Sequence, residues 1–298
     1  MRILMVGLGD IARKAYLPVL TAMPGLEIHL TTRNAQVLEG LGARYRLPHR
    51  HQSLDAAVAS TSFDAAFVHA STPAHPALVE ALLQRGVPVV VDKPLADNLD
   101  DAERLVALAE RQKLLLAVGF NRRFAPDYAA LRDRPRTMVL MQKHRHAQPA
   151  AIRQTVFDDF IHVADTLRFL APAPVQHEQI DTLVRDGLLE AITLTLRGDG
   201  YRAIGIMHRA SGLDEETLDI LGGNRRHSVH NLSSRVDCDG AERRSRRGDW
   251  TSVGRQRGFE AMCSHFLDAV RAGHPTDADD LLATHRLCER IVRHAQGG

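Results

Sequence analysis

The first 120 residues alternate between short apolar runs and longer segments in which apolar residues recur at helical spacing. Five short runs are rich in Val, Ile, Leu and Ala and stop at glycine, proline or a polar residue, which is typical of buried strands. They occupy residues 2–7, 26–34, 64–70, 87–91 and 114–119. Residues 98–112 carry leucine, valine and alanine on one helical face. Strands that alternate with helices predict a parallel, doubly wound α/β sheet.

After Pro126 the hydrophobic pattern changes from βα repeats to consecutive strands. The predicted strands span residues 137–145, 181–200, 202–208, 218–221 and 226–232, and the break at Gly198-Asp199-Gly200 is predicted to be a hairpin turn. Helices are predicted over residues 158–170, 258–272 and 277–294. The pattern predicts a mainly antiparallel sheet, and therefore two domains, residues 1–120 and 121–298. The charged run Glu242–Arg247 lies beside a glycine and is predicted to be a surface loop.

Composition narrows the class of protein. The 298 residues are 44% hydrophobic and 25% charged, with a formal charge of +2, so nothing draws the whole chain to nucleic acid or membrane. Cys238, Cys263 and Cys288 are widely spaced, which argues for a reducing compartment. We find no leader segment and no apolar run long enough to cross a bilayer, and we therefore expect a cytoplasmic protein.

The loop that follows the first strand is the first candidate for ligand binding. Gly7, Gly9, Asp10, Ile11 and Ala12 lie within a G-x-G-x-x-A motif between a predicted strand and a predicted helix. Glycines there let the backbone approach a pyrophosphate, and the start of the helix offers free N–H groups. The motif in this context predicts a dinucleotide site.

The second strand indicates which dinucleotide is bound. NAD enzymes usually carry an acid at its end, whereas this chain has Thr32 and Arg33. A hydroxyl followed by a guanidinium suits a ribose 2′-phosphate, so we expect NADP(H) to be preferred over NAD(H). The alternative is that Arg33 is a solvated loop residue and both cofactors bind.

Lysine is rare in this chain, which draws attention to its positions. Among 38 basic residues the lysines are Lys14, Lys93, Lys113 and Lys143. An amine can lose its proton in a protein, whereas a guanidinium effectively cannot. Lys93 follows the apolar run Val87–Val91 and would stand at the carboxyl end of a central strand, where open α/β sheets bind ligands. Lys93 and Lys143 are therefore the candidates; the alternative for Lys93 is a solvated side chain that follows a strand.

The predicted helix at residues 158–170 supplies a second set of candidates. Asp158, His162 and Asp165 are spaced i, i+4 and i+7, so they would share one face. Hydride transfer at a carbinol carbon requires proton movement at the oxygen, and a histidine that titrates near neutral pH suits that role. A nearby carboxylate can fix its tautomer. The alternative is that His162 is a hydrogen-bonded core histidine.

Several cationic side chains of the second half could line a pocket for a carboxylate or phosphate. The alternative is that they are polar residues on a solvated sheet face. The set comprises Arg123, Lys143, Arg145, His208 and Arg209.

His227 and His230 do not form a predicted metal site. Residues three apart on a strand point to opposite faces, and no cysteine or acid completes a ligand set. The sequence predicts no metal.

Four motifs together resemble one protein family. Gly7–Ala12, Thr72–His75, Asp92-Lys93-Pro94 and Val118–Pro126 are similar to segments of the glucose-fructose oxidoreductase/inositol dehydrogenase/MocA (Gfo/Idh/MocA) family. The similarity extends through most of the chain. Within that family, sequence segments such as Asp158–Asp165 are most similar to those of the MviM-type virulence-factor oxidoreductases.

The resemblance implies a Rossmann domain followed by an α/β domain with an open, largely antiparallel sheet. It implies that the aspartate and histidine of the D-x-x-x-H element flank the substrate, and that the protein forms dimers or tetramers. The family's usual E-K-P is Asp92-Lys93-Pro94 here, and the family's glycines before Asp158 are missing, which suggests a differently shaped entry loop. The cofactor contacts expected beyond the glycine loop are Thr32, Arg33, Ser71, Thr72, His75, Asp92, Lys93 and Asn121.

These observations predict an NADP(H)-dependent oxidoreductase that acts on a small hydroxyl or carbonyl substrate, such as a sugar or cyclitol. If the cationic side chains converge, the substrate is expected to carry an anionic group. Lys93, His162 and Asp158 are the expected catalytic residues; Arg123, Lys143, Arg145, Asp165 and His208 are weaker candidates for substrate contact. One alternative is a cofactor-binding sensor without catalysis. Another is an enzyme of different redox chemistry, such as reduction of an imine or C=C bond, or a lyase that oxidises its substrate transiently.

Overall fold

A computed structural model describes residues 1–297 of the chain. The chain forms two compact units. The first contains Met1–Gly119 and Phe259–Ala283; the second contains Phe120–Gly258 and the chain from Thr284 onward. The helix at 259–272 groups with the first unit, whereas the expected boundary at 120/121 assigns it to the second.

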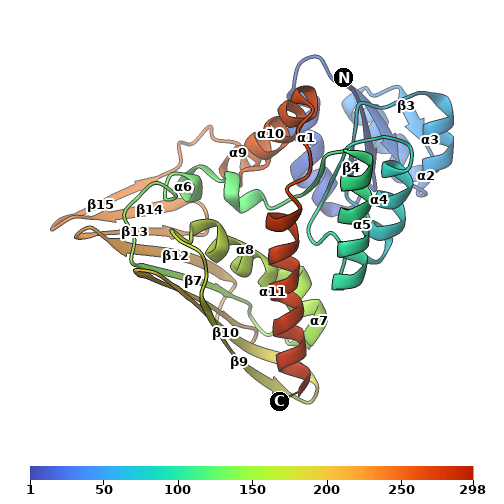
Figure 1. The fold of residues 1–298 in the computed structure, drawn as a ribbon. Coiled ribbons are helices and arrows are strands. Elements are labelled where there is room, and N and C mark those ends of the chain that lie inside the picture. Colours follow the sequence, from blue (N-terminus) through green and yellow to red (C-terminus); the bar gives the residue numbers. More distant parts are fainter. Residues whose placement is uncertain (298) are drawn as a thin grey trace. The chain divides into compact units, whose positions relative to one another are not determined.

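The first unit is a doubly wound parallel sheet with strand order β3-β2-β1-β4-β5-β6 (Figure 1). Every strand pair in it is parallel, which confirms the predicted Rossmann fold. The strands are β1 (Arg2–Val6), β2 (Glu27–Thr31), β3 (His49–His51), β4 (Ala65–Val68), β5 (Val89–Val91) and β6 (Leu116–Val118). The helices are η1 (Ala12–Tyr16, a π-helix), α1 (Leu17–Ala22), α2 (Ala35–Tyr45), α3 (Leu54–Ser60), η2 (Thr72–Ala74), α4 (His75–Leu83), α5 (Leu99–Gln112) and α10 (Phe259–Ala272).

Local signals in the sequence explain where these helices begin and end. The side chain of Asn98 caps α5 by accepting a hydrogen bond from the backbone N–H of Asp101, and Lys113 ends the helix in the left-handed conformation. The apolar face of α5 joins β1, β4 and β5 in one buried cluster. The rigid sheet therefore fixes the loops at its carboxyl edge, where the glycine motif lies.

The second unit is built on a nine-stranded sheet with the order β15-β14-β13-β12-β7-β11-β10-β8, with β9 paired to β10. Only β7 and β11 are parallel neighbours, which confirms the expected open, mainly antiparallel sheet. The strands are β7 (Met138–His144), β8 (Ala150–Ala151), β9 (His177–Arg185), β10 (Leu188–Gly198), β11 (Tyr201–His208), β12 (Glu215–Gly222), β13 (Arg225–His230), β14 (Ser234–Cys238) and β15 (Glu242–Arg246). The helices of the second half of the chain are η3 (Asn121–Phe124), α6 (Pro126–Ala129), α7 (Ile152–Thr155), η4 (Val156–Phe160, a π-helix), α8 (Ile161–Leu170), α9 (Val253–Gln256) and α11 (Ala278–Gly297).

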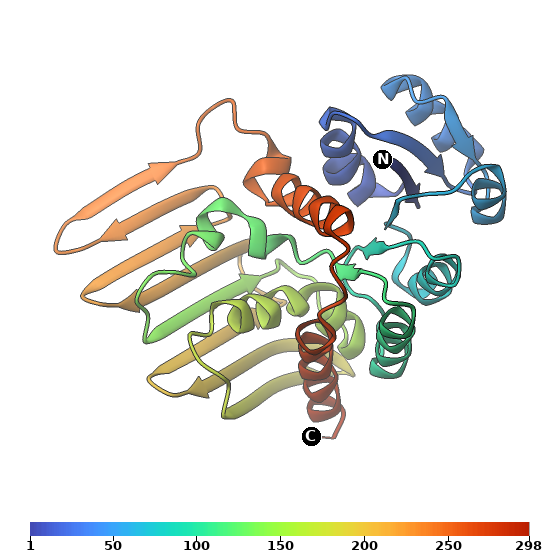
Figure 2. The ribbon, with the colours of Figure 1, turned by 45° about the horizontal axis from the view of Figure 1, so that its top comes forward.

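Helix α8 lies across one face of this sheet (Figure 2). Gly205 on β11 makes the close approach possible, because a Cβ there would stand 2.5 Å from a methyl carbon of Val163. Buried Val139 and Met141 of β7 belong to the same face. Side chains at this face can therefore contact the helix that carries His162.

Two local predictions are corrected by the structure. The charged run Glu242–Arg247 is not a loop: residues 242–246 form β15, because β14 supplies a complete hydrogen-bonding edge and places Asp237 opposite Arg243. The helix expected to begin at Asp158 begins at Ile152 as α7 and continues through the π-helical η4.

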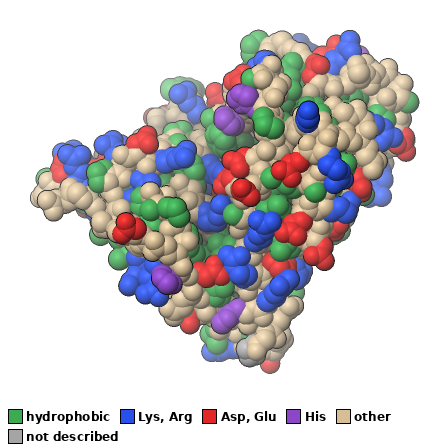
Figure 3. All heavy atoms as spheres, viewed as in Figure 1, with side chains coloured by type: hydrophobic (Ala, Val, Ile, Leu, Met, Phe, Trp, Pro, Cys, Tyr) green, Lys and Arg blue, Asp and Glu red, His purple; other side chains and the backbone are tan. Residues whose placement is uncertain are grey.

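The surface agrees with the small formal charge. On the face shown in Figure 3, acidic and basic side chains are interspersed. Among residues 1–297, no helix combines the length and the apolar character that a membrane crossing needs.

Candidate active site

The glycine loop is held in a conformation that only glycine permits. Gly7 has φ of +86°, and a Cβ there would lie 2.5 Å from the backbone nitrogen of Ala70. Gly9 faces open space, since nothing lies within 4 Å of the position of its absent Cβ. The loop therefore has an exposed backbone next to the start of a helix, as pyrophosphate binding requires.

A cavity of about 500 Å³ opens at the carboxyl ends of β1, β2 and β4. Five of the expected cofactor residues line it: Gly7, Gly9, Thr32, Arg33 and Ser71. The cavity size lies within the range of small-ligand sites. The lining brings together the glycine motif and the residues proposed to select the dinucleotide.

Two buried polar side chains in the cavity lining lack a hydrogen-bond partner within the protein. They are the Thr31 hydroxyl and both ring nitrogens of His69. Burial, and then the nearby His75, lower the pKa of His69 to about 3, so this imidazole is neutral. Buried polar atoms are normally satisfied, so these groups, with the open space at Gly9, fit a bound dinucleotide.

The side chains of Asp92 and His75, two of the expected cofactor contacts, form hydrogen bonds within the protein. Asp92 Oδ1 accepts a hydrogen bond of 2.8 Å from the Tyr16 hydroxyl. Burial raises the pKa of Asp92, while Lys93 and Tyr16 oppose that effect. Both ring nitrogens of His75 contact backbone oxygens, of Pro94 at 2.8 Å and of Ala70 at 2.9 Å. These contacts fix Asp92 and Pro94, the residues on either side of Lys93.

Lys93 lies two residues after the end of β5, as the sequence indicates, and is partly buried. The Lys93–Pro94 peptide bond is cis. Among the described residues, seven expected cofactor residues lie outside the cavity lining: Asp10, Ile11, Thr72, His75, Asp92, Lys93 and Asn121. Asp10 pairs with Lys14 at 2.8 Å. Asn121 belongs to the second unit, where its side-chain amide donates to the backbone oxygen of Arg257.

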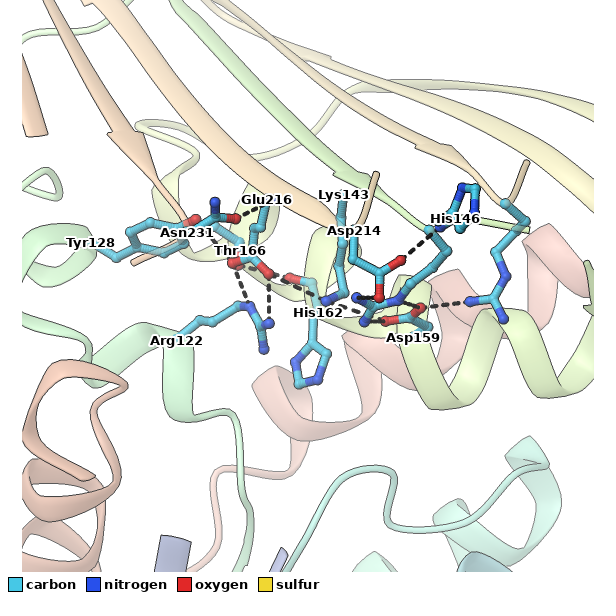
Figure 4. Close-up of polar contacts among 12 residues, drawn as sticks. Arg122, Tyr128, Lys143, His146, Asp159, His162, Thr166, Asp214, Glu216 and Asn231 are labelled. Carbon is cyan, nitrogen blue, oxygen red and sulfur yellow. Dashed lines mark hydrogen bonds and ion pairs between the residues drawn. The ribbon is translucent and has the colours of Figure 1, made fainter. Parts of the chain in front are cut away.

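The three residues of the second unit that were expected to share a helix face differ in burial. Asp158 is exposed, His162 is partly buried and Asp165 is fully buried. Asp158 lies in the π-helical turn η4, whose wider winding departs from the 3.6-residue spacing. Asp165 pairs with Arg123 at 2.6 Å and accepts from Thr284 at 3.0 Å. Figure 4 shows the His162 imidazole extending away from the strands.

The carboxylate that forms ion pairs with several of the cationic side chains is Asp159, the neighbour of the predicted Asp158. Lys143 Nζ lies 3.3 Å from its Oδ1, and Arg145 and Arg209 approach its Oδ2 at 2.7 and 2.6 Å. The structure thus brings together three of the five expected cationic side chains. His208 lies apart from Asp159 and nearer to Glu190, at 3.8 Å.

A second carboxylate extends this cluster along the sheet. Glu216 of β12 lies directly across from Lys143 of β7, with 3.3 Å between the charged groups. Arg122 makes a bidentate contact to Glu216 at 2.8 and 2.6 Å, and Tyr128 donates to it at 3.0 Å. We call Arg122, Lys143, Arg145, Asp159, Arg209 and Glu216 the buried charge cluster.

The cluster keeps its acids ionised. Burial raises the pKa of Asp159, but the Arg145 hydrogen bond and the charges of Lys143, Arg145 and Arg209 outweigh it, so the net shift is downward. Burial likewise opposes ionisation of Glu216, and Arg122 and Lys143 lower its pKa strongly. Burial and Arg122 lower the pKa of Lys143, against the two carboxylates. The cluster therefore offers fixed charges near His162 on the helix.

Sequence reasoning missed Asp159, Glu216, Arg122 and His69. The pair Asp158-Asp159 presents two adjacent carboxylates, and an α-helical spacing favoured the first. Glu216 alternates with apolar residues on β12 in a way that indicates an inward side chain, and this signal could have found it.

Three comparisons place this chain among known proteins. A model of an oxidoreductase family with an NAD-binding Rossmann fold matches residues 1–120, and a model of the YceM-like C-terminal domain matches residues 126–239. YceM of Salmonella typhimurium is 36% identical over an alignment that covers 99% of this chain and 98% of that protein. Inositol 2-dehydrogenase 4 of Saccharopolyspora erythraea is 32% identical, covering 81% and 77%. The crystal structure of the dehydrogenase MviM from Clostridium difficile superposes with a TM-score of 0.93 at 31% identity, covering 99% of each chain.

Proposed function

The chain belongs to the Gfo/Idh/MocA family of oxidoreductases, and on that premise we propose that it uses NADP(H) to transfer hydride to or from a small anionic substrate. The substrate would carry a hydroxyl or carbonyl group at the reacting carbon and a carboxylate or phosphate elsewhere. Sugar acids and cyclitol derivatives have that chemistry, and one relative is an inositol dehydrogenase.

The cofactor proposal rests on the cavity of the first unit. The backbone at Gly7 and Gly9 would hold the pyrophosphate, and Thr32 and Arg33 would bind the ribose 2′-phosphate. The unpartnered groups of Thr31 and His69 would gain hydrogen-bond partners. When bound, the nicotinamide accepts or donates the hydride.

The chain's own residues would manage the substrate oxygen. We assign to Lys93 the stabilisation of negative charge at that oxygen and a contact to the nicotinamide ribose. His162 would hold or release the proton, and Asp158 would orient the imidazole. Lys93 could share the proton transfer. The contacts of Tyr16 with Asp92 and of His75 with Pro94 support a fixed position for the Lys93 backbone.

The excess of positive charge in the buried charge cluster is the observation that supports an anionic substrate. Four cationic side chains, Arg122, Lys143, Arg145 and Arg209, surround two carboxylates. A third carboxylate, the half-exposed Asp214, lies 3.9 Å from Arg145. Buried charges are normally paired, so the remaining excess of one positive charge favours an additional anion. Arg145 is the most exposed of these four side chains, at 26%, and is the best placed to contact it.

Paired substrates test this proposal. With NADP⁺, gluconate and galacturonate should give a higher kcat/KM than glucose and galactose. Arg145→Gln should reduce that preference by about tenfold or more, because one charged contact of this kind is worth roughly 1.5–3 kcal/mol. Arg202→Gln is the control, since Arg202 is exposed on β11. A preference for the neutral sugars would contradict the proposal.

We also propose a homo-oligomer formed through the sheet face that α8 does not cover. Register places Met138 and Leu140 of β7 beside Leu221 of β12 and Ile204 of β11 on that face. Leu221 is 39% exposed, and the others are partly exposed. An apolar patch of this kind is typical of protein interfaces. Light scattering of Leu140→Lys against the parent protein tests it: a smaller particle is expected.

A further inference from the structure

A group of imidazoles lies at the edge of the first unit's sheet. Parallel pairing places His29 of β2 directly beside His49 of β3, and His51 lies beside Thr31. Residues two apart on a strand share a face, so Glu27, His29, His49 and His51 all point to one side. None of these four is among the residues that line the dinucleotide cavity.

The potential ligand atoms of three of these residues converge. One atom each from Glu27, His29 and His49 lies within 4.8 Å of the others, and this is the only such group of three or more found among residues 1–297. His29 Nε2 stands 2.9 Å from Glu27 Oε1. The rings of His29 and His49 stack with an angle of 7° and a centroid distance of 4.2 Å.

The fourth side chain acts on the ring of His29 from its other nitrogen. His51 Nε2 lies 3.1 Å from His29 Nδ1, and Phe63 packs edge-on against the same ring at 5.0 Å. His29 is only 3% exposed, so its ring is held in one orientation. A metal-binding histidine usually donates its second N–H to a neighbouring acceptor, which fixes tautomer and direction. His51 can serve as that acceptor.

We propose that Glu27, His29 and His49 form a binding site for a divalent transition-metal ion of the zinc type. The ion would replace the proton between His29 Nε2 and Glu27 Oε1, and water would complete a tetrahedral set. Two imidazoles and a carboxylate are ligands that zinc accepts. His49 is not buried, so its ring can turn from the stack to bring its lone pair toward the ion.

One feature of the site works against metal binding and provides a test. Arg2 Nε lies 3.5 Å from Glu27 Oε1, where the ion would bind, and its positive charge repels a cation. Removing that charge should strengthen binding at this site and leave a site elsewhere on the chain unaffected. In the ion's absence the same residues form a hydrogen-bond chain from His51 through His29 to Glu27.

Calorimetric titration of the full chain with Zn²⁺ tests the proposal. One ion should bind per chain, and His49→Gln and Glu27→Gln should each weaken the Kd by at least roughly tenfold. Arg2→Gln should tighten it. His177→Gln on β9 is the matched control and should leave the Kd unchanged. His29 is left intact because its buried ring supports the fold, and circular dichroism of each variant verifies folding.

Substitution of Co²⁺ provides a readout that reports the ligands. A visible spectrum of tetrahedral cobalt without thiolate charge transfer is expected, and it should disappear in His49→Gln. Absence of stoichiometric binding, binding unaltered by His49→Gln and Glu27→Gln, or a thiolate band from Cys238 would each overturn the proposal.

Discussion

Tyr16, in the π-helical turn after the glycine loop, donates a hydrogen bond of 2.8 Å to Asp92, the residue before Lys93. The shorter acid in place of the family's glutamate is thus matched by a tyrosine from another element of the same unit. A Cβ at Gly119 would lie 2.5 Å from the Tyr16 hydroxyl, so the glycine leaves room for this contact.

Tyr16→Phe should destabilise the protein by about 1–3 kcal/mol, because it leaves the partly buried Asp92 carboxylate without its hydroxyl donor. Urea denaturation at pH 7 measures the free energy of unfolding. Tyr45→Phe is the control, since the Tyr45 ring is partly exposed and lies under Arg44. Equal losses in the two variants would contradict a specific role for the Tyr16–Asp92 contact.

Glu216→Gln should cost roughly 3–5 kcal/mol of unfolding free energy, because it leaves Arg122 and Lys143 buried with less compensation. Glu242→Gln breaks an exposed pair with Arg244 and should change the stability far less. The same denaturation experiment compares them. A Glu216→Gln protein as stable as the parent would contradict the prediction that the Glu216 carboxylate compensates the buried charges of Arg122 and Lys143.

The neutral His69 predicts a dependence of stability on pH. Its pKa falls from 6.5 to about 3 on folding, so between those values the unfolded chain binds a proton that the folded chain does not. The free energy of unfolding therefore decreases as the pH falls from 6.5 toward 3. Between pH 6.5 and 4.5 this imidazole accounts for roughly 2–3 kcal/mol.

His69→Gln should flatten the stability profile in that window by the same amount, measured by denaturation at several pH values. His177→Gln, which changes an exposed imidazole, should leave the profile as it is in the parent protein. Coincident profiles for parent and His69→Gln would refute the assignment of a buried neutral ring.

Arg33 predicts the cofactor preference. Arg33→Gln should weaken NADPH binding by about tenfold or more and leave NADH binding within a factor of about three, because only NADPH carries the 2′-phosphate. Fluorescence titration gives both values of Kd, with Arg44→Gln on α2 as a control. If the parent protein binds NADH as tightly as NADPH, Arg33 is not a selector.

Both sheets could be predicted from the hydrophobic pattern, because βα alternation and consecutive strands each leave a periodic signature. The sequence could not place Glu242–Arg246 in a strand, since its pairing depends on the distant β14 rather than on its own charged residues. It could not assign α10 to the first unit, because that grouping reflects tertiary contacts across a large gap in the chain.

The candidate site was predictable in part for the same reason. The glycine loop, Thr32, Arg33 and Lys93 follow from motifs that act locally. Asp159, and not Asp158, points into the buried charge cluster because of a π-helical turn that no residue pattern in the sequence predicts. The unpartnered state of His69 arises only when β4 meets its neighbours in the folded unit.

The most direct test of the account is turnover by Lys93→Met. The parent protein should reduce NADP⁺ with at least one acidic polyol from the panel of gluconate, galacturonate and related acids. Lys93→Met should lose about 10²–10³-fold in kcat while its NADPH Kd stays within about tenfold, and Lys113→Met, at the end of α5, should retain full rate. Full turnover in Lys93→Met, or tight NADPH binding by a parent protein that turns over nothing, would contradict the proposed catalysis.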